Sequence, residues 1–229
     1  MRRLSATAVC SLFLLFTFPH GLFAKSDMPI GTRQQKSHHD DKRILRLAGT
    51  PKASIGSADR IKFFAKTLSG VDRDWGNVGF ILEELLRIHL QWTRYPLDDY
   101  LVATSLKYMG GGKTIGELDL VVIRRGDGHV VEVGQVKFSR NPRQVVRKAR
   151  EQIVRFKNAL RDGKVEKLKW SDTDAAAPSL SAFTEQTRHI TYGCLDSVSS
   201  GFDYELDIDR DEGDAVQEML LAGTRVGAR

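Results

Sequence analysis

The chain has 229 residues, of which 41% are hydrophobic and 28% are charged, and its formal net charge is +6. This length and composition are sufficient for one ordinary folded domain. No internal repeat is evident, and no segment beyond the N-terminus is apolar enough to span a bilayer, so the sequence excludes a repeat array and a multi-span membrane protein.

The N-terminus has the order of a secretory signal peptide. Arg2 and Arg3 precede an apolar run over residues 9–18, and Ala24 follows as the small residue of a cleavage site. The apolar run is shorter than a membrane span, so we expect no stable membrane insertion after cleavage. The sequence therefore predicts a signal peptide over residues 1–24 and an exported protein, either periplasmic or secreted. An uncleaved anchor and a start of translation at Met28 are the alternatives.

Residues 25–57 are mostly polar, and they include Gly31, Gln34 and the run Gly49-Thr50-Pro51. This composition is typical of a linker. We therefore place the folded domain at residues 58–229.

The first predicted helix of the domain runs from Asn77 to about Trp92. Apolar residues recur there at helical spacing and form one face. They are Val78, Ile81, Leu82, Leu85, Ile88 and Trp92. Glu83 and Glu84 lie at the flanks of this face, where the simplest interpretation is a solvated pair of carboxylates.

Three strands are predicted after this helix. Residues 100–106 form the first, and Gly110-Gly111-Gly112 turns into the second. The second and third, over residues 116–122 and 129–137, are joined by Arg125-Gly126-Asp127-Gly128. Asp-Gly supplies the positive φ that a hairpin turn needs, so these two strands are antiparallel neighbours.

This hairpin carries charged residues in mid-strand. Because alternate residues of a strand share a face, Glu117 and Asp119 point together on one strand, and Gln135 and Lys137 point together on the next. Burying unpaired charges is costly, so apolar strands seldom carry them without a reason. The hairpin is therefore the candidate functional site.

A second helix begins at Asn141-Pro142, since proline is favoured at the first helical position, and ends near Asp162-Gly163. Much of its surface is basic. Clustered positive charge favours binding to a polyanion, although a merely solvated face is the commoner outcome. The candidate nucleic-acid-binding residues are Arg143, Arg147, Lys148 and Arg150.

The remaining elements are a late strand and an acidic tail. Residues 189–195 predict the strand, and Cys194 within it is expected to be a buried core residue. In the tail, Tyr204, Leu206 and Ile208 alternate with acidic residues, which predicts an edge strand followed by a short helix. Its negative charge would repel a nucleic acid, so we expect the tail to lie away from the binding face.

An Asp on one strand, followed on the next by Gln, any residue and Lys, resembles the signature of the PD-(D/E)XK nuclease superfamily. Asp119 and Gln135-Val136-Lys137 carry it here, in a form similar to the Gln-x-Lys variant of Mrr-like endonucleases. Gly116-Glu117-Leu118-Asp119-Leu120 also resembles a segment of several small members. The resemblance covers about residues 77–195. It implies an α/β fold with a restriction endonuclease-like core: helix, three-stranded meander, helix and strand, in a mixed central sheet flanked by helices.

The resemblance also implies a metal-dependent site. Mrr-like relatives carry an acidic residue on the first helix, followed two positions later by an apolar one, and Glu83 fits that place. The catalytic candidates are Asp119, Gln135, Lys137 and Glu83. The candidate ligands of Mg²⁺ or Mn²⁺ are Asp119, Glu83 and Glu117.

Lys137 would orient or deprotonate a metal-bound water, and Gln135 would position that water or ligate the metal. Glu132 would take a role in the site only if a bulge at Gly134 shifted the strand register.

The sequence therefore predicts an exported, metal-dependent nuclease that hydrolyses phosphodiester bonds of DNA, with RNA as the second candidate substrate. The alternative is a catalytically inactive nuclease-fold protein that acts as a nucleic-acid-binding or assembly component, which Gln135 in place of a glutamate favours. A third interpretation is an α/β domain whose motif is accidental. No Ser-His-Asp or Cys-His arrangement and no P-loop spacing is present, and nothing in the sequence indicates an oligomeric state.

We expect the N-terminus to be removed during export, because Arg2-Arg3, the apolar run and Ala24 follow in the order that a signal peptidase requires. Intact-mass spectrometry of the mature protein should show a chain that begins near Lys25. A soluble cytoplasmic product that retains Met1 would contradict this.

Overall fold

A mixed seven-stranded sheet organises the protein, in the computed structural model that describes residues 43–47, 49–171 and 175–226. The strands lie in the order β1 (Ile44–Leu45), β7 (Tyr204–Leu206), β6 (Phe183–Gly193), β4 (Val130–Lys137), β3 (Lys113–Arg124), β2 (Tyr100–Gly110) and β5 (Lys167–Trp170). Neighbours are antiparallel from β4 to β5 and parallel from β1 to β4. The expected signal peptide and most of the expected linker lie outside the described residues.

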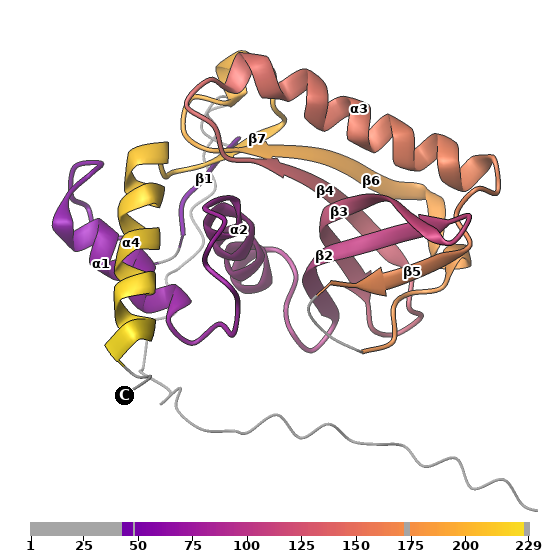
Figure 1. Cartoon of the computed structure of the whole chain (residues 1–229), viewed down its shortest axis with the longest axis horizontal. Coiled ribbons are helices and arrows are strands. Elements are labelled where there is room, and N and C mark those ends of the chain that lie inside the picture. The colour runs from indigo at the N-terminus through magenta and orange to yellow at the C-terminus, as the bar shows by residue number, and fades with distance from the viewer. Residues whose placement is uncertain (1–42, 48, 172–174, 227–229) are drawn as a thin grey trace, which may run out of the picture. The chain divides into compact units, whose positions relative to one another are not determined.

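Four α-helices among the described residues flank this sheet, so the predicted α/β class with a mixed sheet and flanking helices is confirmed. They are α1 (Ala58–Leu68), α2 (Gly79–Thr93), α3 (Pro142–Arg161) and α4 (Arg210–Val226). Figure 1 shows α3 along one face of the sheet, over β4 and β6, and α2 on the other side. None of the described helices combines the length and the hydrophobicity that crossing a membrane requires.

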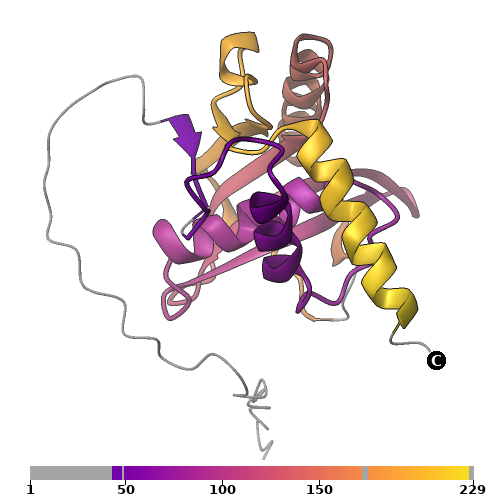
Figure 2. The ribbon, with the colours of Figure 1, turned by 90° about the vertical axis from the view of Figure 1, so that its left-hand side faces the viewer.

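Two apolar cores fill the two faces of the sheet. On the α3 face, the Phe156 ring packs edge-to-face against Tyr108 and Phe183, with ring centres 5.1 and 5.2 Å away. On the other face, α2 buries Ile81, Leu82 and other residues of its apolar stripe. There α1 and α4 lie beside each other (Figure 2) and are joined by a buried pair of Arg60 and Glu212, whose Nε and Oε1 are 2.7 Å apart.

The elements with strong local patterns lie where the sequence predicts them. The predicted helices are α2 and α3, and the predicted hairpin is β3 and β4, with Gly128 at a φ of 71° in the turn. The predicted turn between β2 and β3 is present, with Gly110 at the end of β2 and with Gly111 and Gly112 at positive φ. The late strand is longer than predicted, because β6 begins at Phe183, and Cys194 is buried as expected.

Four elements differ from the prediction. The helix α1 lies where no helix was predicted, although Ser57 caps it and its buried Phe64, Ala65 and Leu68 have helical spacing. Ile44 and Leu45 were placed in a linker, but they pair with β7, and the burial of Leu45 and Leu47 anchors them. The tail strand β7 is therefore not at the edge of the sheet. The strand β5 was not predicted; it alternates exposed lysines with buried Leu168 and Trp170 over only four residues.

The start of α4, in the acidic tail, lies near the start of α3. Arg140, two residues before α3, contacts Asp211 at 2.6 Å and Asp214 at 2.7 Å at the start of α4. Arg140 is thus engaged by the tail, and the basic surface of α3 begins at Arg143. These contacts involve no nucleic acid, so the expectation that the tail lies away from a bound one stays a prediction.

Candidate functional site

The strands β3 and β4 separate at Asp119. Their pairing runs from Ile123 to Leu120 and then stops. Beyond that point, side chains join the two strands: Oδ2 of Asp119 accepts the backbone N–H of Val136 at 2.8 Å, and Nε2 of Gln135 donates to the Glu117 carbonyl at 2.8 Å. Because buried backbone groups need partners, these side chains are what allows the strands to part.

The point at which β3 and β4 separate, called the fork below, brings three of the predicted site residues together. Nζ of Lys137 lies 2.7 Å from Oδ2 of Asp119 and 3.2 Å from Oε1 of Gln135. It also donates to the Val136 carbonyl at 2.9 Å. The Lys137 and Asp119 side chains are 18% and 13% exposed, so the ion pair is shielded but reachable from solvent.

Glu83 approaches this group from α2 without a hydrogen bond to it. Its Oε2 lies 2.9 Å from Nη2 of Arg73, and its side chain is 13% exposed. Burial raises the pKa of Glu83 to about 8, and the negative charges of Asp119 and Glu117 add to this rise. Arg73 and Lys137 oppose the rise but do not cancel it. Glu83 therefore lies in the electrostatic field of the two hairpin carboxylates.

Glu84 is a structural residue, and neither glutamate is solvated as the simplest interpretation had it. Its carboxylate lies 2.5 Å from Arg73, 2.6 Å from Arg87 and 2.8 Å from the Thr104 hydroxyl. Although burial raises its pKa, Arg87, Thr104 and Arg73 hold the net pKa of Glu84 below its ordinary value. The pKa values of Glu83 and Glu84 shift in opposite directions because Glu84 has two guanidinium partners, Arg73 and Arg87, whereas Glu83 has only Arg73.

Arg73, in the segment between α1 and α2, is the residue that the sequence analysis missed. Its guanidinium donates to Glu83, Glu84, Thr104 and Ser105, and it stacks on Phe80 with its central carbon 3.8 Å from the ring centre. No periodicity marks Arg73 in the polar run Asp72-Arg73-Asp74, so the sequence carries no local signal for it.

Ser105 in β2 has strained backbone next to this site. Its φ is 63°, in the left-handed region that a residue other than glycine seldom adopts, at a cost of about 1–3 kcal/mol. Thr104 pairs with Leu120 and Leu106 with Leu118, so Ser105 lies across from Asp119. Backbone strain of this kind clusters at functional sites, where the surroundings hold it in place.

The third candidate ligand, Glu117, is half-buried and lies at the rim of the site. Its Oε1 is 3.4 Å from the Ser171 hydroxyl, and no described contact links its carboxylate directly to Asp119. The structure therefore brings Asp119, Gln135 and Lys137 into contact, places Glu83 within their field and leaves Glu117 beside them.

The donors at the fork have the chemistry that a hard divalent cation prefers, since they are carboxylate, amide and backbone carbonyl oxygens. The cationic neighbours engage only one oxygen of each carboxylate, Oε2 of Glu83 and Oδ2 of Asp119. However, no three His, Cys, Asp or Glu side chains of the described residues converge as a ligand set. A cation here would therefore take two carboxylates and complete its shell with amide or carbonyl oxygens or water.

Glu132 lies apart from the site. It is fully buried and accepts hydrogen bonds from Tyr192 at 2.5 Å, from Tyr95 at 2.8 Å and from Arg188. The irregularities of this hairpin lie between Val122 and Ile123 rather than at Gly134. The condition under which Glu132 would join the site is therefore not met.

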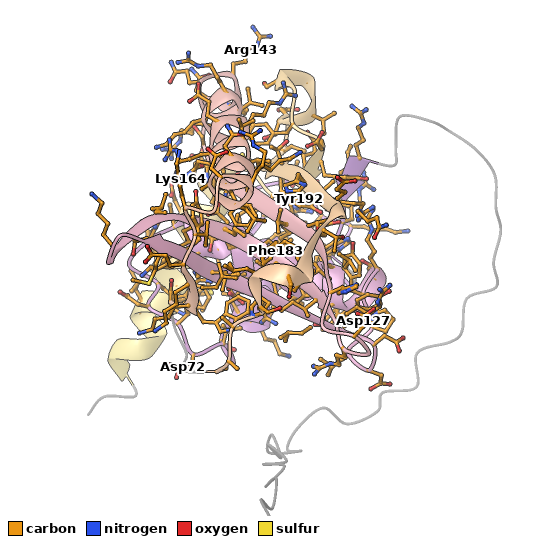
Figure 3. The ribbon with its side chains drawn as sticks, turned by 90° about the vertical axis from the view of Figure 1, so that its right-hand side faces the viewer. Asp72, Asp127, Arg143, Lys164, Phe183 and Tyr192 are labelled. Atoms are coloured by element: carbon orange, nitrogen blue, oxygen red, sulfur yellow. The ribbon has the colours of Figure 1, made fainter. Side chains whose placement is uncertain are left out.

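The candidate nucleic-acid-binding residues are all exposed on α3, and Arg143 projects outward from the start of the helix (Figure 3). Arg147 pairs with Glu151 at 3.6 Å, and Arg150 donates to the Gly201 carbonyl. Lys148 has no described contact and extends the same basic surface. Comparison with protein-family models, with curated proteins and with solved structures gave no match for this chain.

The raised pKa of Glu83 makes stability depend on pH. A carboxyl whose pKa is about 8 in the fold and 4.5 in the unfolded chain binds its proton more tightly when folded. Its contribution is thus present below the unfolded value and is lost as the pH rises to the folded value. Without divalent ions, the free energy of unfolding of the parent should fall relative to Glu83→Gln between about pH 5 and pH 8.

Urea unfolding at several pH values measures this difference. Glu84→Gln is the matched control, because Arg87, Thr104 and Arg73 hold the pKa of Glu84 below its ordinary value rather than above it. The gap between the parent and Glu84→Gln should therefore stay constant. A parent curve parallel to that of Glu83→Gln would contradict the prediction.

Proposed function

We propose that the protein is a metal-dependent nuclease that hydrolyses phosphodiester bonds, with DNA as its first candidate substrate and RNA as the second. The observation that carries this proposal is the contact of Lys137 with Asp119 at the fork of β3 and β4, with Gln135 beside them. A carboxylate that can hold a divalent cation and an ammonium that can offset negative charge meet at one partly exposed point, with the buried amide of Gln135 beside them.

The arrangement of elements supports a restriction endonuclease-like core as the finer description of the fold. The helix α2 precedes an antiparallel meander of β2, β3 and β4, and α3 leads into the crossover that returns to the sheet. The strand β6 then lies parallel to β4. This is the order of helix, meander, helix and strand that the resemblance implies, with the short β5 added at the edge.

Each residue of the fork has a role that its contacts allow. Asp119 and Glu83 would hold Mg²⁺ or Mn²⁺, with Glu117 at the rim as a further oxygen donor. The bound ion would supply a more acidic water and charge compensation at the phosphate. Lys137, held in place by Asp119 and the Val136 carbonyl, would orient the attacking water and offset negative charge on phosphorus. Gln135 is fixed by the Glu117 carbonyl and would position that water.

The charge of α3 and of the N-terminus indicates what the protein would bind and where it would act. The exposed basic residues Arg143, Arg147, Lys148 and Arg150 of α3 would lie along a phosphate backbone. The signal-like N-terminus adds that the protein acts after export, in the periplasm or outside the cell. A second candidate function is binding without catalysis. It is favoured by the lack of a third convergent acidic ligand among the described residues.

Asp119→Asn should abolish divalent-dependent cleavage while it leaves DNA binding largely intact, because it removes the charge of a metal ligand but keeps a side-chain oxygen that can accept the Val136 N–H. Lys137→Ala should lower kcat by about 10²–10⁴-fold but keep metal affinity, since an ammonium repels the cation. Cleavage of plasmid and linear DNA by residues 26–229, with Mg²⁺, with Mn²⁺ and with EDTA, measures both effects.

The matched controls are Asp98→Ala and Lys52→Ala, which change exposed residues outside α2, β3 and β4. Both should cleave like the parent, and thermal melting should show every variant folded. If Asp119→Asn cleaves as fast as the parent, or if the parent cleaves no nucleic acid with any divalent ion, the proposal of binding without catalysis replaces this one.

The basic surface of α3 predicts a change in salt dependence. Combined Arg143→Ala, Arg147→Ala and Arg150→Ala should weaken DNA binding to a similar extent for all sequences. It should also flatten the plot of log affinity against log salt by roughly one unit of slope per lost phosphate contact. Fluorescence anisotropy with labelled duplexes at several salt concentrations measures both quantities.

Lys167→Ala with Lys169→Ala is the control, because these exposed lysines lie on β5 at the edge of the sheet. They should leave the slope unchanged. An unchanged slope for the α3 variant would place the binding surface elsewhere.

A further inference from the structure

We propose that Arg73 is a positioning residue that sets the Glu83 carboxylate beside Asp119 by joining α2 to β2. The inference rests on the proposed function, because it assigns Arg73 a purpose at that site. Arg73 lies outside the hairpin motif, and its guanidinium has polar partners on both α2 and β2.

The guanidinium of Arg73 connects two elements through its two terminal nitrogens. Nη1 donates to Glu84 at 2.5 Å and to the Thr104 hydroxyl at 3.0 Å. Nη2 donates to Glu83 at 2.9 Å and to the Ser105 hydroxyl at 2.8 Å. Each nitrogen thus binds one carboxylate of α2 and one hydroxyl of β2, so the planar group fixes the spacing of helix and strand at this point.

The surroundings hold the guanidinium in one place. The Arg73 side chain is 4% exposed and stacks on Phe80. Its Nε is buried without a hydrogen-bond partner in the described structure. A buried donor without a partner costs free energy, so this placement does not maximise the hydrogen bonds of Arg73. It instead satisfies Glu83, Glu84 and the two hydroxyls that Nη1 and Nη2 contact.

The same contacts distinguish a positioning role from competition with a cation. Arg73 engages only Oε2 of Glu83, which leaves Oε1 for another ligand. Glu84, held also by Arg87, is the fixed anchor of the arrangement, whereas Glu83 has no second guanidinium. The strained Ser105, across from Asp119, completes the link to the fork. Removal of Arg73 should therefore release Glu83 rather than open a better cation site.

The experiment compares Arg73→Met, Arg73→Lys and Arg87→Met in the full chain, with Mn²⁺ as the probe. Isothermal titration without nucleic acid should show Mn²⁺ binding about 10–100-fold weaker for Arg73→Met, the range typical of groups that orient metal ligands. Arg73→Lys should bind Mn²⁺ as weakly, because an ammonium keeps the charge but lacks the planar arrangement of donors of a guanidinium. Arg87→Met removes the guanidinium that touches Glu84 alone and should bind Mn²⁺ like the parent.

A crystal structure of Arg73→Met gives a readout that is independent of metal and of cleavage. Glu83 should leave its parent position while Glu84 keeps its contact with Arg87. A retained Glu83 position would overturn the proposal, as would Mn²⁺ binding by Arg73→Met that equals or exceeds that of the parent. If the parent fails to cleave any nucleic acid, the nuclease proposal fails alone, since the position of Glu83 still decides the role of Arg73.

Ser105→Gly is the second variant if substitutions of Arg73 prevent folding. Glycine accepts the positive φ of this position, so the change removes the hydroxyl anchor of the guanidinium while it relaxes the backbone. The variant should show weaker Mn²⁺ binding and a displaced Glu83. An unchanged Glu83 position in its crystal structure would overturn the proposal.

Discussion

The interaction on which the fold and the candidate site both depend is the hydrogen bond from the Val136 backbone to the Asp119 carboxylate. Strands that separate inside a sheet leave N–H and C=O groups without partners, and this is costly in a buried setting. Asp119 replaces the lost partner on one side, and Gln135 does so for the Glu117 carbonyl on the other. With these bonds made, β4 continues along β6 as far as Lys137, and the polar groups that compensate for the separation are also the chemically useful ones.

The sequence predicts the elements whose signals are local. The apolar stripe of α2, the Asp-Gly turn between β3 and β4 and the proline at the start of α3 each depend on residues a few positions apart. By contrast, Ile44-Leu45 is a strand of two residues, too short to show an alternation. It pairs with β7, and the burial of Leu45 and Leu47 in the core on the α2 side anchors it, which is a matter of tertiary packing. The alternation of Tyr204, Leu206 and Ile208 predicts β7 as a strand but not its place inside the sheet.

The same division separates the parts of the site. Alternation along two neighbouring strands is enough to bring Lys137 near Asp119, so the motif could be recognised from the sequence. Arg73 and Ser105 carry no such pattern. Arg73 donates hydrogen bonds to residues 10 to 32 positions further along the chain, and the positive φ of Ser105 occurs in a run without glycine. Both depend on how α2 lies against β2, and this packing has no counterpart in local sequence.

Three acidic side chains of the core side show why burial alone does not mark a functional carboxylate. Glu132 is fully buried, but two tyrosine hydroxyls and Arg188 supply it with donors on both oxygens. Glu84 is likewise saturated by two arginines and Thr104. Glu83 shares one guanidinium and faces Asp119 and Glu117, and therefore its pKa rises where that of Glu84 falls. An unsaturated carboxylate in the field of others must take up either a proton or a cation. If the proposed divalent ion binds here, it has to displace that proton, and the unsaturated carboxylate, rather than the most buried one, is the group with an oxygen left for it.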